Sequence, residues 1–275
     1  MPVSLTGLEG RIALVTGAGR SRGIGRTTAL ELARAGCDVI VTGSGRDPAT
    51  YPADEKKLAW RDAESVADEI RALGRRSMAV VCDIASLADV RSLGERVARE
   101  FGGVDFVVNN AAFVPPARER VPVIDADPVV WGKVIDVNVK GTFHMCHVFG
   151  RMLVEGGRGG AIVNVTSIAG KRMAPRNAGY GTSKAALHAL TAALSGELAE
   201  YQIRVNAVCP GITVTAAMDE VPAGAWESMV KANIPLGRPG RPEDTAAMVL
   251  FLCSEQGAWI TGQIYSVDGG QVAGR

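Results

Sequence analysis

The sequence predicts an α/β fold of the doubly wound type, in which helices cover both faces of a mostly parallel, seven-stranded sheet. Short runs rich in β-branched residues alternate with longer helix-like segments along all 275 residues, which is the pattern of a layered α/β architecture. The runs are nearly all apolar, as is typical of parallel strands buried on both faces. A glycine-rich turn follows the first run directly, at the place where doubly wound folds bind phosphates.

Seven short apolar runs are the expected strands. They cover residues 12–16, 39–42, 78–82, 106–109, 161–166, 205–209 and 264–267. Longer segments between them have the composition and length of helices. They cover residues 25–35, 63–73, 87–101, 129–153, 180–199 and 242–254. No internal repeat or linker divides this alternation, so we expect one domain over residues 1–275, a length that α/β folds often reach undivided.

The composition is that of a globular protein with no strong charge. There are 30 Lys and Arg against 29 Asp and Glu, and 47% of the residues are apolar, which excludes a disordered chain. The near-zero net charge argues against nucleic acid or an anionic membrane as the main partner, because both favour strongly basic faces. Glycine is in excess, with 33 among 275 residues against a usual share of about 7%.

Cysteine usage and apolar runs indicate a cytoplasmic protein with no membrane partner. The five cysteines are scattered singly with no CxxC pair, which suits reduced thiols in a cytosolic protein. Residues 1–11 lack the basic start and apolar run of a signal peptide. The longest apolar run, residues 246–253, is far shorter than the roughly 20 residues that span a membrane.

Two segments, residues 44–61 and 213–235, match no regular element. Pro48 and Pro52 are expected to keep the first segment non-helical, and the second also contains prolines and a glycine. In an open parallel sheet the ligand lies beyond the carboxyl ends of the strands, where such loops gather. Both segments are therefore candidates to cover a cofactor or substrate, and residues 213–235 are the expected substrate loop.

The glycine-rich turn at residues 16–25 is a candidate phosphate-binding loop. A diphosphate at a helix N-terminus meets unpaired N–H groups and the positive end of the helix dipole. Glycines permit the tight turn and the close approach of backbone to phosphate. The expected contacts are Gly17, Arg20, Ser21, Arg22, Gly23 and Ile24. A glycine-rich turn without a ligand is the alternative, but its place between the first strand and a helix favours a dinucleotide.

The residues after the second strand favour NADP(H) over NAD(H). NAD-binding folds usually place Asp or Glu near this point to bind the adenosine ribose, whereas here no carboxylate occurs before Asp47. Its absence removes the repulsion that a 2′-phosphate would meet. Ser44 and Arg46 are expected contacts, and Arg46 and Arg22 are candidate counter-charges. The alternative is that both arginines are simply solvated.

Tyr180 and Lys184 form a candidate catalytic pair. They stand at i and i+4, so on a helix they share one face. A free Tyr has a pKa near 10 and is a poor base, but an adjacent ammonium favours the phenolate. Tyr180 would then exchange a proton with a carbonyl or hydroxyl oxygen. Ser167, just after the fifth strand, would hydrogen-bond to that oxygen and orient it.

The ordered set of motifs resembles the classical short-chain dehydrogenase/reductase family over essentially the whole chain. The matching motifs are residues 16–25, 109–112, Asn138, Ser167, 180–184, 210–211 and 267–270. The pattern is most similar to the 3-oxoacyl-carrier-protein reductase-like members. The resemblance implies a Rossmann-type fold and an NAD(P)(H)-dependent enzyme that transfers a hydride between nicotinamide and a carbonyl or secondary alcohol.

The resemblance also implies roles for individual residues. Lys184 would additionally bind the nicotinamide ribose, Tyr180 would also contact the cofactor, and Asn138 would support a water-linked proton relay. The remaining cofactor contacts would be Asp83 and Ile84 beside the adenine, Asn110, Ala111 and Ala112 beneath the adenosine, and Pro210, Gly211, Thr213 and Thr215 at the nicotinamide carboxamide. The family needs no catalytic metal, so His144 and His147, at i and i+3 on one helix, are interpreted as structural.

Two departures from the family pattern affect the cofactor site. Five residues separate Gly17 from Gly23 where the family usually has three, so the contacts of individual amides with the phosphates are open. The segment at residues 44–61 is longer than the family's usual link. It either folds over the adenosine end of the cofactor or forms a mobile surface loop, and the surface loop is the favoured interpretation.

The leading hypothesis is a carbonyl reductase or alcohol dehydrogenase for small to medium substrates. The alternatives are a reductase specific for 3-oxoacyl thioesters, a catalytically silent dinucleotide-binding scaffold, and an epimerase or dehydratase. A silent scaffold should lack part of the Asn/Ser/Tyr/Lys set, which is complete here. The resemblance further implies a homotetramer, or else a dimer, with helices near residues 129–153 and 180–199 between subunits.

Substrate specificity is expected in residues 113–125 and 213–235. Five apolar side chains are candidates to line the substrate pocket or to pack against another subunit, namely Phe113, Val114, Met173, Met218 and Trp226. Three basic residues, Lys171, Arg172 and Arg176, are expected near the mouth of the site. They are interpreted as solvated, with an anionic substrate or an acidic carrier protein as the alternative.

Overall fold

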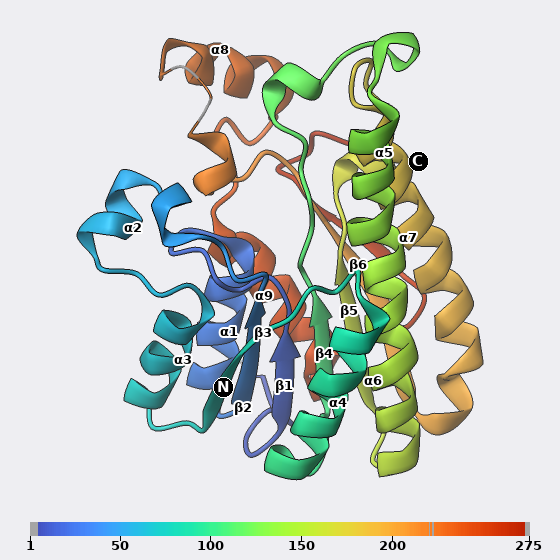
Figure 1. Ribbon diagram of the computed structural model, residues 1–275. Coiled ribbons are helices and arrows are strands. Elements are labelled where there is room, and N and C mark those ends of the chain that lie inside the picture. Colours follow the sequence, from blue (N-terminus) through green and yellow to red (C-terminus); the bar gives the residue numbers. More distant parts are fainter. Residues whose placement is uncertain (1–4, 220, 222, 273–275) are drawn as a thin grey trace.

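A parallel sheet of seven strands forms the centre of the computed structural model, which describes residues 5–219, 221 and 223–272 (Figure 1). The strands are β1 (Ile12–Val15), β2 (Asp38–Gly43), β3 (Ser77–Val81), β4 (Phe106–Asn109), β5 (Gly160–Val165), β6 (Ile203–Pro210) and β7 (Ile264–Val267). Their order in the sheet is β3-β2-β1-β4-β5-β6-β7. Every neighbouring pair is parallel, so the predicted doubly wound fold is confirmed.

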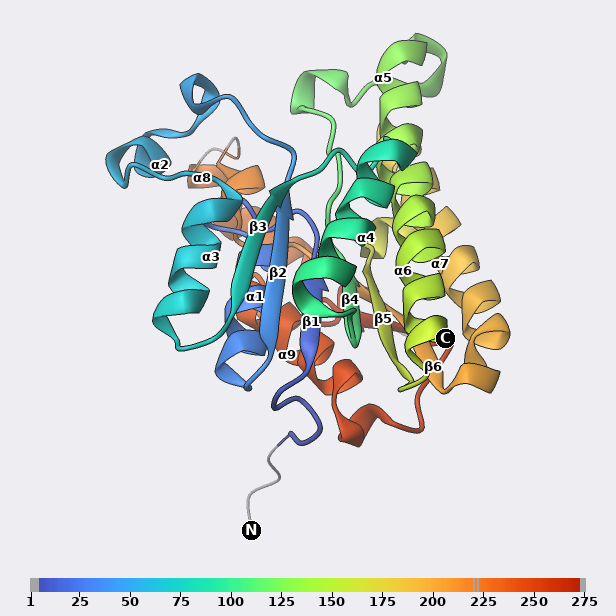
Figure 2. The same ribbon diagram turned by 60° about the horizontal axis from the view of Figure 1, so that its bottom comes forward.

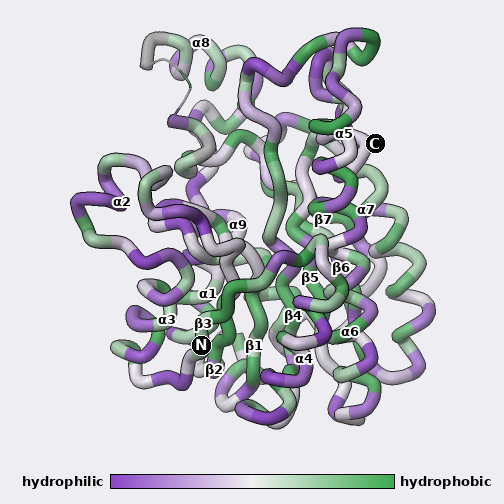
Figure 3. Tube along the Cα trace, in the orientation of Figure 1, coloured by the Kyte–Doolittle hydropathy of each residue, from purple (hydrophilic) through white to green (hydrophobic). Residues whose placement is uncertain are grey.

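Helices cover both faces of this sheet because each strand sends alternate apolar side chains to opposite sides. The helices are α1 (Ile24–Arg34), α2 (Ala53–Lys57), α3 (Ala63–Ala72), α4 (Leu87–Phe101), α5 (Pro128–Val134), α6 (Thr142–Gly156), α7 (Ala178–Glu197), α8 (Ala223–Asn233) and α9 (Pro242–Cys253). Buried residues of α1, α3 and α9 pack on one face, and those of α4 and α6 pack on the other (Figure 2). The strands form the apolar centre, and the polar residues lie outside (Figure 3).

The topology creates a crevice at the carboxyl ends of β1 and β4. β1 pairs with β2 on one side and with β4 on the other, so the chain changes its winding direction between β1 and β4. Ligands of open α/β sheets bind at such a switch point. The glycine-rich turn, the segment after β4 and helix α8 all lie at this end of the sheet (Figure 1).

The prediction that residues 44–61 and 213–235 contain no regular structure was wrong. The first segment contains a 3₁₀ turn at Pro48–Thr50 and helix α2, and the second contains a 3₁₀ turn at Ala216–Met218 and helix α8. Pro48 is the first residue of its turn, and Pro52 is the N-cap of α2. A proline at a helix start loses no hydrogen bond and presets φ, so these prolines begin helical turns.

The segment predicted as one helix over residues 129–153 is divided in three. Helix α5 passes into a π-helical turn at Ile135–Gly141, which continues as α6. Such turns insert one residue into the helical repeat and are frequent at functional sites. This turn carries Asn138, one of the predicted catalytic residues.

None of the helices in the described ranges is both long and apolar enough to cross a membrane.

Candidate active site

Asn110 and Ala111 hold the beginning of the glycine-rich turn against the end of β4. The hydroxyl of Thr16 accepts hydrogen bonds from the N–H groups of Asn110 and Ala111, both at 3.0 Å. The Asn110 amide donates to the carbonyls of Thr16 at 2.9 Å and Gly17 at 3.0 Å. Gly17 has φ +65°, and a Cβ there would lie 2.6 Å from the Ala111 Cα. The close approach of the two chain segments therefore requires glycine.

The turn delivers the N-terminus of α1 to the crevice. Gly23 is the N-cap of α1 and brings no side chain to its first N–H groups. A Cβ on Gly25 would lie 2.5 Å from the Asn110 amide nitrogen, so the first turn packs directly on the segment after β4. These N–H groups and the helix dipole suit the diphosphate of a dinucleotide. The residues present therefore fit the predicted phosphate-binding loop.

The two additional residues of this loop are bound by the segment after β2. Glu55 of α2 is fully buried, and its carboxylate accepts a hydrogen bond of 2.8 Å from the Ser21 N–H. The Trp60 indole N–H donates to the Gly19 carbonyl at 2.6 Å. Burial alone would raise the pKa of Glu55, but hydrogen bonds from Arg46 and from the Ser21 N–H hold that pKa below its usual range. Residues 44–61 therefore pack against the glycine-rich loop through Glu55 and Trp60, although a mobile surface loop was the favoured interpretation.

Both arginines that the sequence offered as counter-charges for a 2′-phosphate have carboxylate partners. Arg22 forms a bidentate pair with Asp219, at 2.6 and 2.9 Å, and also contacts Asp54 at 2.7 Å. Arg46 lies 2.8 Å from Glu55 and 3.2 Å from Asp62. Neither guanidinium is a free positive charge, and neither is simply solvated.

The structure brings Tyr180, Lys184 and Ser167 together at the carboxyl end of β5. Tyr180 and Lys184 lie on α7, and Ser167 caps the 3₁₀ turn at Ile168–Gly170. The Lys184 Nζ lies 5.5 Å from the centre of the Tyr180 ring. Lys184 is fully buried, and its ammonium donates to the Val165 carbonyl at 3.2 Å.

Burial controls the ionisation of this pair. It raises the pKa of Tyr180 above its usual value, against the opposing effects of the Ser167 hydroxyl and of Arg120. It also lowers the pKa of Lys184 to about 8. The pKa of Tyr180 is thus raised, although the sequence predicted that Lys184 would lower it. The influence of Arg120, which lies in a segment without a recognisable pattern, was not predicted.

Asn138 is fully buried in the π-helical turn, where its side chain fixes the segment after β4. Its Oδ1 accepts from the Phe113 N–H at 2.7 Å, and its Nδ2 donates to the Phe113 carbonyl at 3.0 Å. Nδ2 also donates to the Ser183 hydroxyl at 3.1 Å. The amide thus joins α7 to the loop that faces the crevice, and the proton relay remains a prediction.

The other predicted cofactor residues lie at the ends of β3 and β6. Asp83 accepts a hydrogen bond from the Ala85 N–H at 3.0 Å, and Ile84 is buried. The Ile84 carbonyl contacts the Nδ1 of His144 at 3.0 Å, which gives this histidine a structural partner. The part of the chain that the structure describes contains no group of three or more potential His, Cys, Asp or Glu metal ligands.

After β6, the segment with Pro210, Gly211, Thr213 and Thr215 is held by the chain that follows β7. The Gly211 N–H donates to the Val267 carbonyl at 3.0 Å, and the Ile212 N–H donates to the Gln271 side chain at 2.7 Å. Sequence reasoning missed Gln271, because the contact joins two loops that are far apart in the chain.

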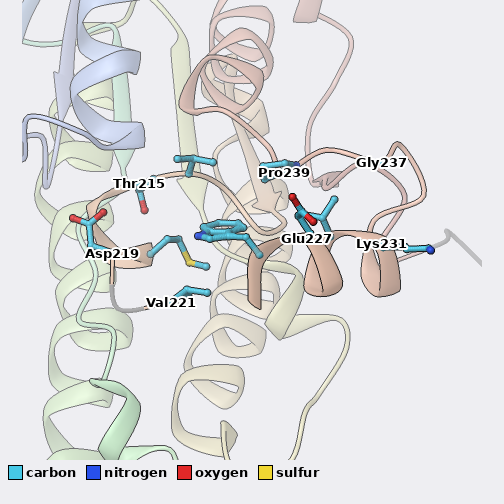
Figure 4. Close-up of a pocket in the computed structure, with 11 residues that line it drawn as sticks. Thr215, Asp219, Val221, Glu227, Lys231, Gly237 and Pro239 are labelled. Atoms are coloured by element: carbon cyan, nitrogen blue, oxygen red, sulfur yellow. The ribbon is translucent and has the colours of Figure 1, made fainter. Parts of the chain in front are cut away.

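Helix α8 and the segment after β6 line an open cavity of about 700 Å³. Its walls include Val214, Met218, Trp226, Val230 and Pro239, with Asp219, Glu227 and Lys231 among its charged members. Thr215 and Pro239 lie on one side and Val221 on the other (Figure 4). Of the five apolar side chains that the sequence offered for a substrate pocket or a subunit contact, Met218 and Trp226 line this cavity. A smaller pocket beside Tyr180 is lined by residues that include Arg120, Trp131 and Arg176.

His188, on α7, makes the fold sensitive to acid. Its Nε2 lies 3.1 Å from the Thr166 hydroxyl and 3.3 Å from the Cys209 sulfur. Burial, then Lys171 and Lys184, lower the pKa of His188 to about 4. Between pH 6.5 and 4 the unfolded chain therefore binds a proton that the folded chain does not, and stability falls as the pH decreases.

We expect wild type to lose on the order of 2 kcal/mol more unfolding free energy than His188→Gln between pH 6.5 and pH 4. Urea unfolding at a series of pH values measures this difference. His147→Gln, at an exposed position of α6, is the control and should follow wild type. Identical pH dependence in wild type and His188→Gln would contradict the assignment.

Comparison with known proteins identifies similar chains of the same length. A family model described as Enoyl-(Acyl carrier protein) reductase matches residues 17–271. The 7alpha-hydroxysteroid dehydrogenase of Escherichia coli (strain K12) is 33% identical over 96% of this chain and 95% of its own. A 3-oxoacyl-[acyl-carrier-protein] reductase of Staphylococcus aureus (strain Mu50) is 37% identical over 94% of this chain and 96% of its own.

Solved structures show the same relationship. A 7 alpha-hydroxysteroid dehydrogenase complexed with NADH and 7-oxo glycochenodeoxycholic acid superposes with a TM-score of 0.83, at 33% identity over 96% of this chain and 94% of that one. Carveol dehydrogenase from Mycobacterium avium in complex with NAD has a TM-score of 0.85, at 26% identity over 96% and 98% of the two chains.

Proposed function

The chain belongs to the classical short-chain dehydrogenase/reductase family, and from this premise we propose that Tyr180 is the proton donor and acceptor of its reaction. The family relationship establishes an oxidoreductase that transfers a hydride between a nicotinamide cofactor and an alcohol or carbonyl substrate. The observation that supports the assignment is the position of Tyr180 beside Ser167 and the buried Lys184 at the carboxyl end of β5.

Each side chain has a separate task in this proposal. The bound nicotinamide supplies or accepts the hydride. Tyr180 donates a proton to the carbonyl oxygen in reduction and removes it from the hydroxyl in oxidation. The Ser167 hydroxyl hydrogen-bonds to the same oxygen and fixes its orientation. Lys184 binds the nicotinamide ribose and, while protonated, favours the Tyr180 phenolate.

In this proposal Asn138 is a positioning residue. Both hydrogens of its amide are donated, to Phe113 and Ser183, and its Oδ1 accepts from the Phe113 N–H, so it holds the loop after β4 and helix α7 at a fixed separation. The π-helical turn around it supports the proposed water-linked relay, because such turns disturb the regular backbone hydrogen bonding of a helix.

The ion pairs of Arg22 and Arg46 support NAD(H) as the preferred cofactor. The sequence favoured NADP(H) because no carboxylate directly follows β2 and because two arginines were available to a 2′-phosphate. Both guanidinium groups are instead engaged by carboxylates. The attraction on which the NADP(H) preference depended is therefore largely neutralised, and we propose NAD(H) in its place.

The substrate is proposed to be an apolar alcohol or ketone of medium size. The cavity of about 700 Å³ beneath α8 is lined mainly by aliphatic and aromatic side chains, which suits a hydrophobic molecule. A 3-oxoacyl thioester is the second candidate, supported by the similarity to 3-oxoacyl-[acyl-carrier-protein] reductases.

A panel of steroids, cyclic ketones, sugars and acyl thioesters tests this proposal. Each compound is offered with NADH and with NADPH in parallel, and consumption of the reduced nicotinamide is followed by its absorbance. Turnover of apolar ketones is the expected result. Binding of the dinucleotide without turnover of any compound would favour the catalytically silent scaffold.

We further propose a single domain that assembles as a homotetramer in the cytoplasm. Phe143 on α6 is half exposed and Trp259 is fully exposed, as apolar side chains at subunit contacts are in an isolated chain. All five cysteines are buried and free, which supports a reducing compartment. A mass of one chain in light scattering would contradict the assembly.

A further inference from the structure

Gly19 and Gly43 face a common space that is filled by the carboxylate of Asp62. Gly19 belongs to the phosphate-binding loop, and Gly43 is the last residue of β2. A Cβ on Gly19 would lie 1.7 Å from Oδ1 of Asp62, and a Cβ on Gly43 would lie 2.9 Å from Oδ2. A side chain at the end of β2 would therefore occupy the space that the Asp62 carboxylate fills. Asp62 itself follows residues 44–61, which we call the inserted segment.

The carboxylate of Asp62 is held in place but retains capacity to accept hydrogen bonds. Its Oδ1 accepts from the Arg46 side chain at 3.2 and 3.4 Å, and its Oδ2 accepts from the Arg46 N–H at 3.4 Å. These contacts are long for hydrogen bonds to a carboxylate, whose two oxygens together offer about four acceptor sites. The side chain is 13% exposed, so it is largely fixed by its surroundings but can still be reached from solvent.

The charges around Arg46 do not balance. Its guanidinium lies between two carboxylates, Glu55 at 2.8 Å and Asp62 at 3.2 Å, which leaves this group with one excess negative charge. Arg22, on the same loop, likewise lies between the carboxylates of Asp54 and Asp219. Arg22 and Arg46 are therefore each outnumbered by carboxylates, so neither would attract a doubly charged phosphate placed beside it.

We propose that Asp62 binds the adenosine ribose of NAD(H) through its hydroxyls and excludes the 2′-phosphate of NADP(H). This inference rests on the proposed function and names the residue that selects its cofactor. In dinucleotide-binding α/β folds a carboxylate near the end of the second strand accepts a hydrogen bond from the ribose 2′-hydroxyl. Here β2 ends in glycine, and the inserted segment supplies the carboxylate from its far end.

In this proposal the inserted segment and the lengthened glycine-rich loop together form the binding site for the adenosine ribose. Glu55 holds Arg46 and the Ser21 N–H, while Trp60 holds the Gly19 carbonyl. These contacts fix the loop and Arg46, and Arg46 in turn holds the Asp62 carboxylate beside Gly19. Sequence inspection restricted to the residues directly after β2 misses Asp62, because the intervening helical turns separate it from the strand.

The binding of NADH and NADPH to the purified protein, measured without substrate by titration of nicotinamide fluorescence, tests this inference. We expect wild type to bind NADH about tenfold or more tightly than NADPH, as the loss of a hydrogen bond to a charged group implies. Asp62→Asn should bind NADH about tenfold more weakly and NADPH more tightly, so that the preference disappears or reverses. Asn is the replacement closest in shape to Asp, which here has φ +53° and ψ −133°.

Asp47→Asn is the matched control. Asp47 is exposed on the same segment and caps the turn at Pro48–Thr50 through its side chain, a role that Asn also fulfils. Asp47→Asn removes one negative charge, as Asp62→Asn does, and should leave the ratio of the affinities for NADH and NADPH unchanged. An equal shift in both variants would show a general charge effect and overturn the role of Asp62.

The wild-type ratio decides the question even if Asp62→Asn does not fold. Tighter binding of NADPH than of NADH by wild type would overturn the inference, whatever the variants do. The binding titration contains no substrate and so does not depend on turnover. A protein that binds NADH selectively but turns over no compound of the panel would therefore contradict the proposed reaction and leave the assignment of Asp62 standing. Turnover that depends on NADPH would contradict this assignment and the proposed NAD(H) preference, and it would leave the proposed role of Tyr180 standing.

Discussion

Tyr180→Phe lowers kcat/KM by about a thousandfold or more, since general acid–base catalysis typically contributes 10² to 10⁴. Phe retains the ring that packs at the end of β5 and removes only the hydroxyl that exchanges the proton. Binding of NADH should change little, because the contacts proposed for the dinucleotide come mainly from the glycine-rich loop and from Lys184. Initial rates with the best substrate of the panel and a separate NADH titration measure the two effects.

Tyr201→Phe is the matched control for this prediction. Tyr201 is exposed, at 44% of its surface, and lies beyond the carboxyl end of α7. Tyr201→Phe removes the same hydroxyl group at a position away from the crevice and should leave kcat/KM unaltered. A Tyr180→Phe enzyme with near-normal kcat/KM would remove Tyr180 from the mechanism, and equal losses in both variants would indicate damage to the fold.

The ionisation of Tyr180 gives the two reaction directions opposite pH dependence. Burial raises the pKa of Tyr180 above its usual value, so the neutral phenol prevails at neutral pH. Reduction requires this protonated form and should persist as the pH decreases through neutrality. Oxidation requires the phenolate, so its rate should increase with pH toward the raised pKa, which protonated Lys184 and an oxidised nicotinamide would lower.

Patterns that are local in the chain allowed the fold and the catalytic set to be predicted. Each strand is a short apolar run because both faces of the sheet are covered, and the observed strand limits agree with the predicted ones within two residues. Tyr180 and Lys184 are one helical turn apart, so their proximity follows from the sequence alone. Ser167 joins them because parallel strands end at one edge of the sheet.

Contacts between distant segments could not be predicted in the same way. Glu55 meets Ser21, and Asp62 meets Gly19, only because the segment after β2 folds back onto the glycine-rich loop. Nothing in the spacing of these residues indicates the pairing. Prolines were interpreted as helix breakers, although Pro48 and Pro52 stand where a helical turn begins. The π-helical turn was missed because one inserted residue changes the apolar periodicity very little.

Lys184→Met is the second variant with a large expected effect. It should increase the stability of the protein and decrease its activity. Lys184 is fully buried and has no carboxylate partner among the described residues. Burial lowers its pKa to about 8, which means that the folded state disfavours the charged form that prevails at pH 7. Met fills a similar volume without a charge, so the variant without cofactor should be more stable at pH 7, by on the order of 2 kcal/mol.

This gain in stability should decrease as the pH rises. Between pH 8 and 10.5 the unfolded wild-type chain retains the Lys184 proton that the folded chain has released, so wild-type stability increases with pH through this group. The difference between the two proteins should therefore be largest at neutral pH and small above pH 10.5. Urea unfolding of both proteins across this range measures it, and a variant that is less stable at pH 7 would show that the ammonium is well accommodated.

Activity should change in the opposite direction. Without the ammonium, the ribose contact and the support for the Tyr180 phenolate are both lost, so kcat/KM should decrease by about a hundredfold or more. The wild-type rate of reduction should also decline above pH 8 as Lys184 loses its proton, and the variant should lack this decline. A residue that only filled the core would lower the rate and the stability together, whereas a functional charge buried at some cost lowers the rate and raises the stability when it is removed.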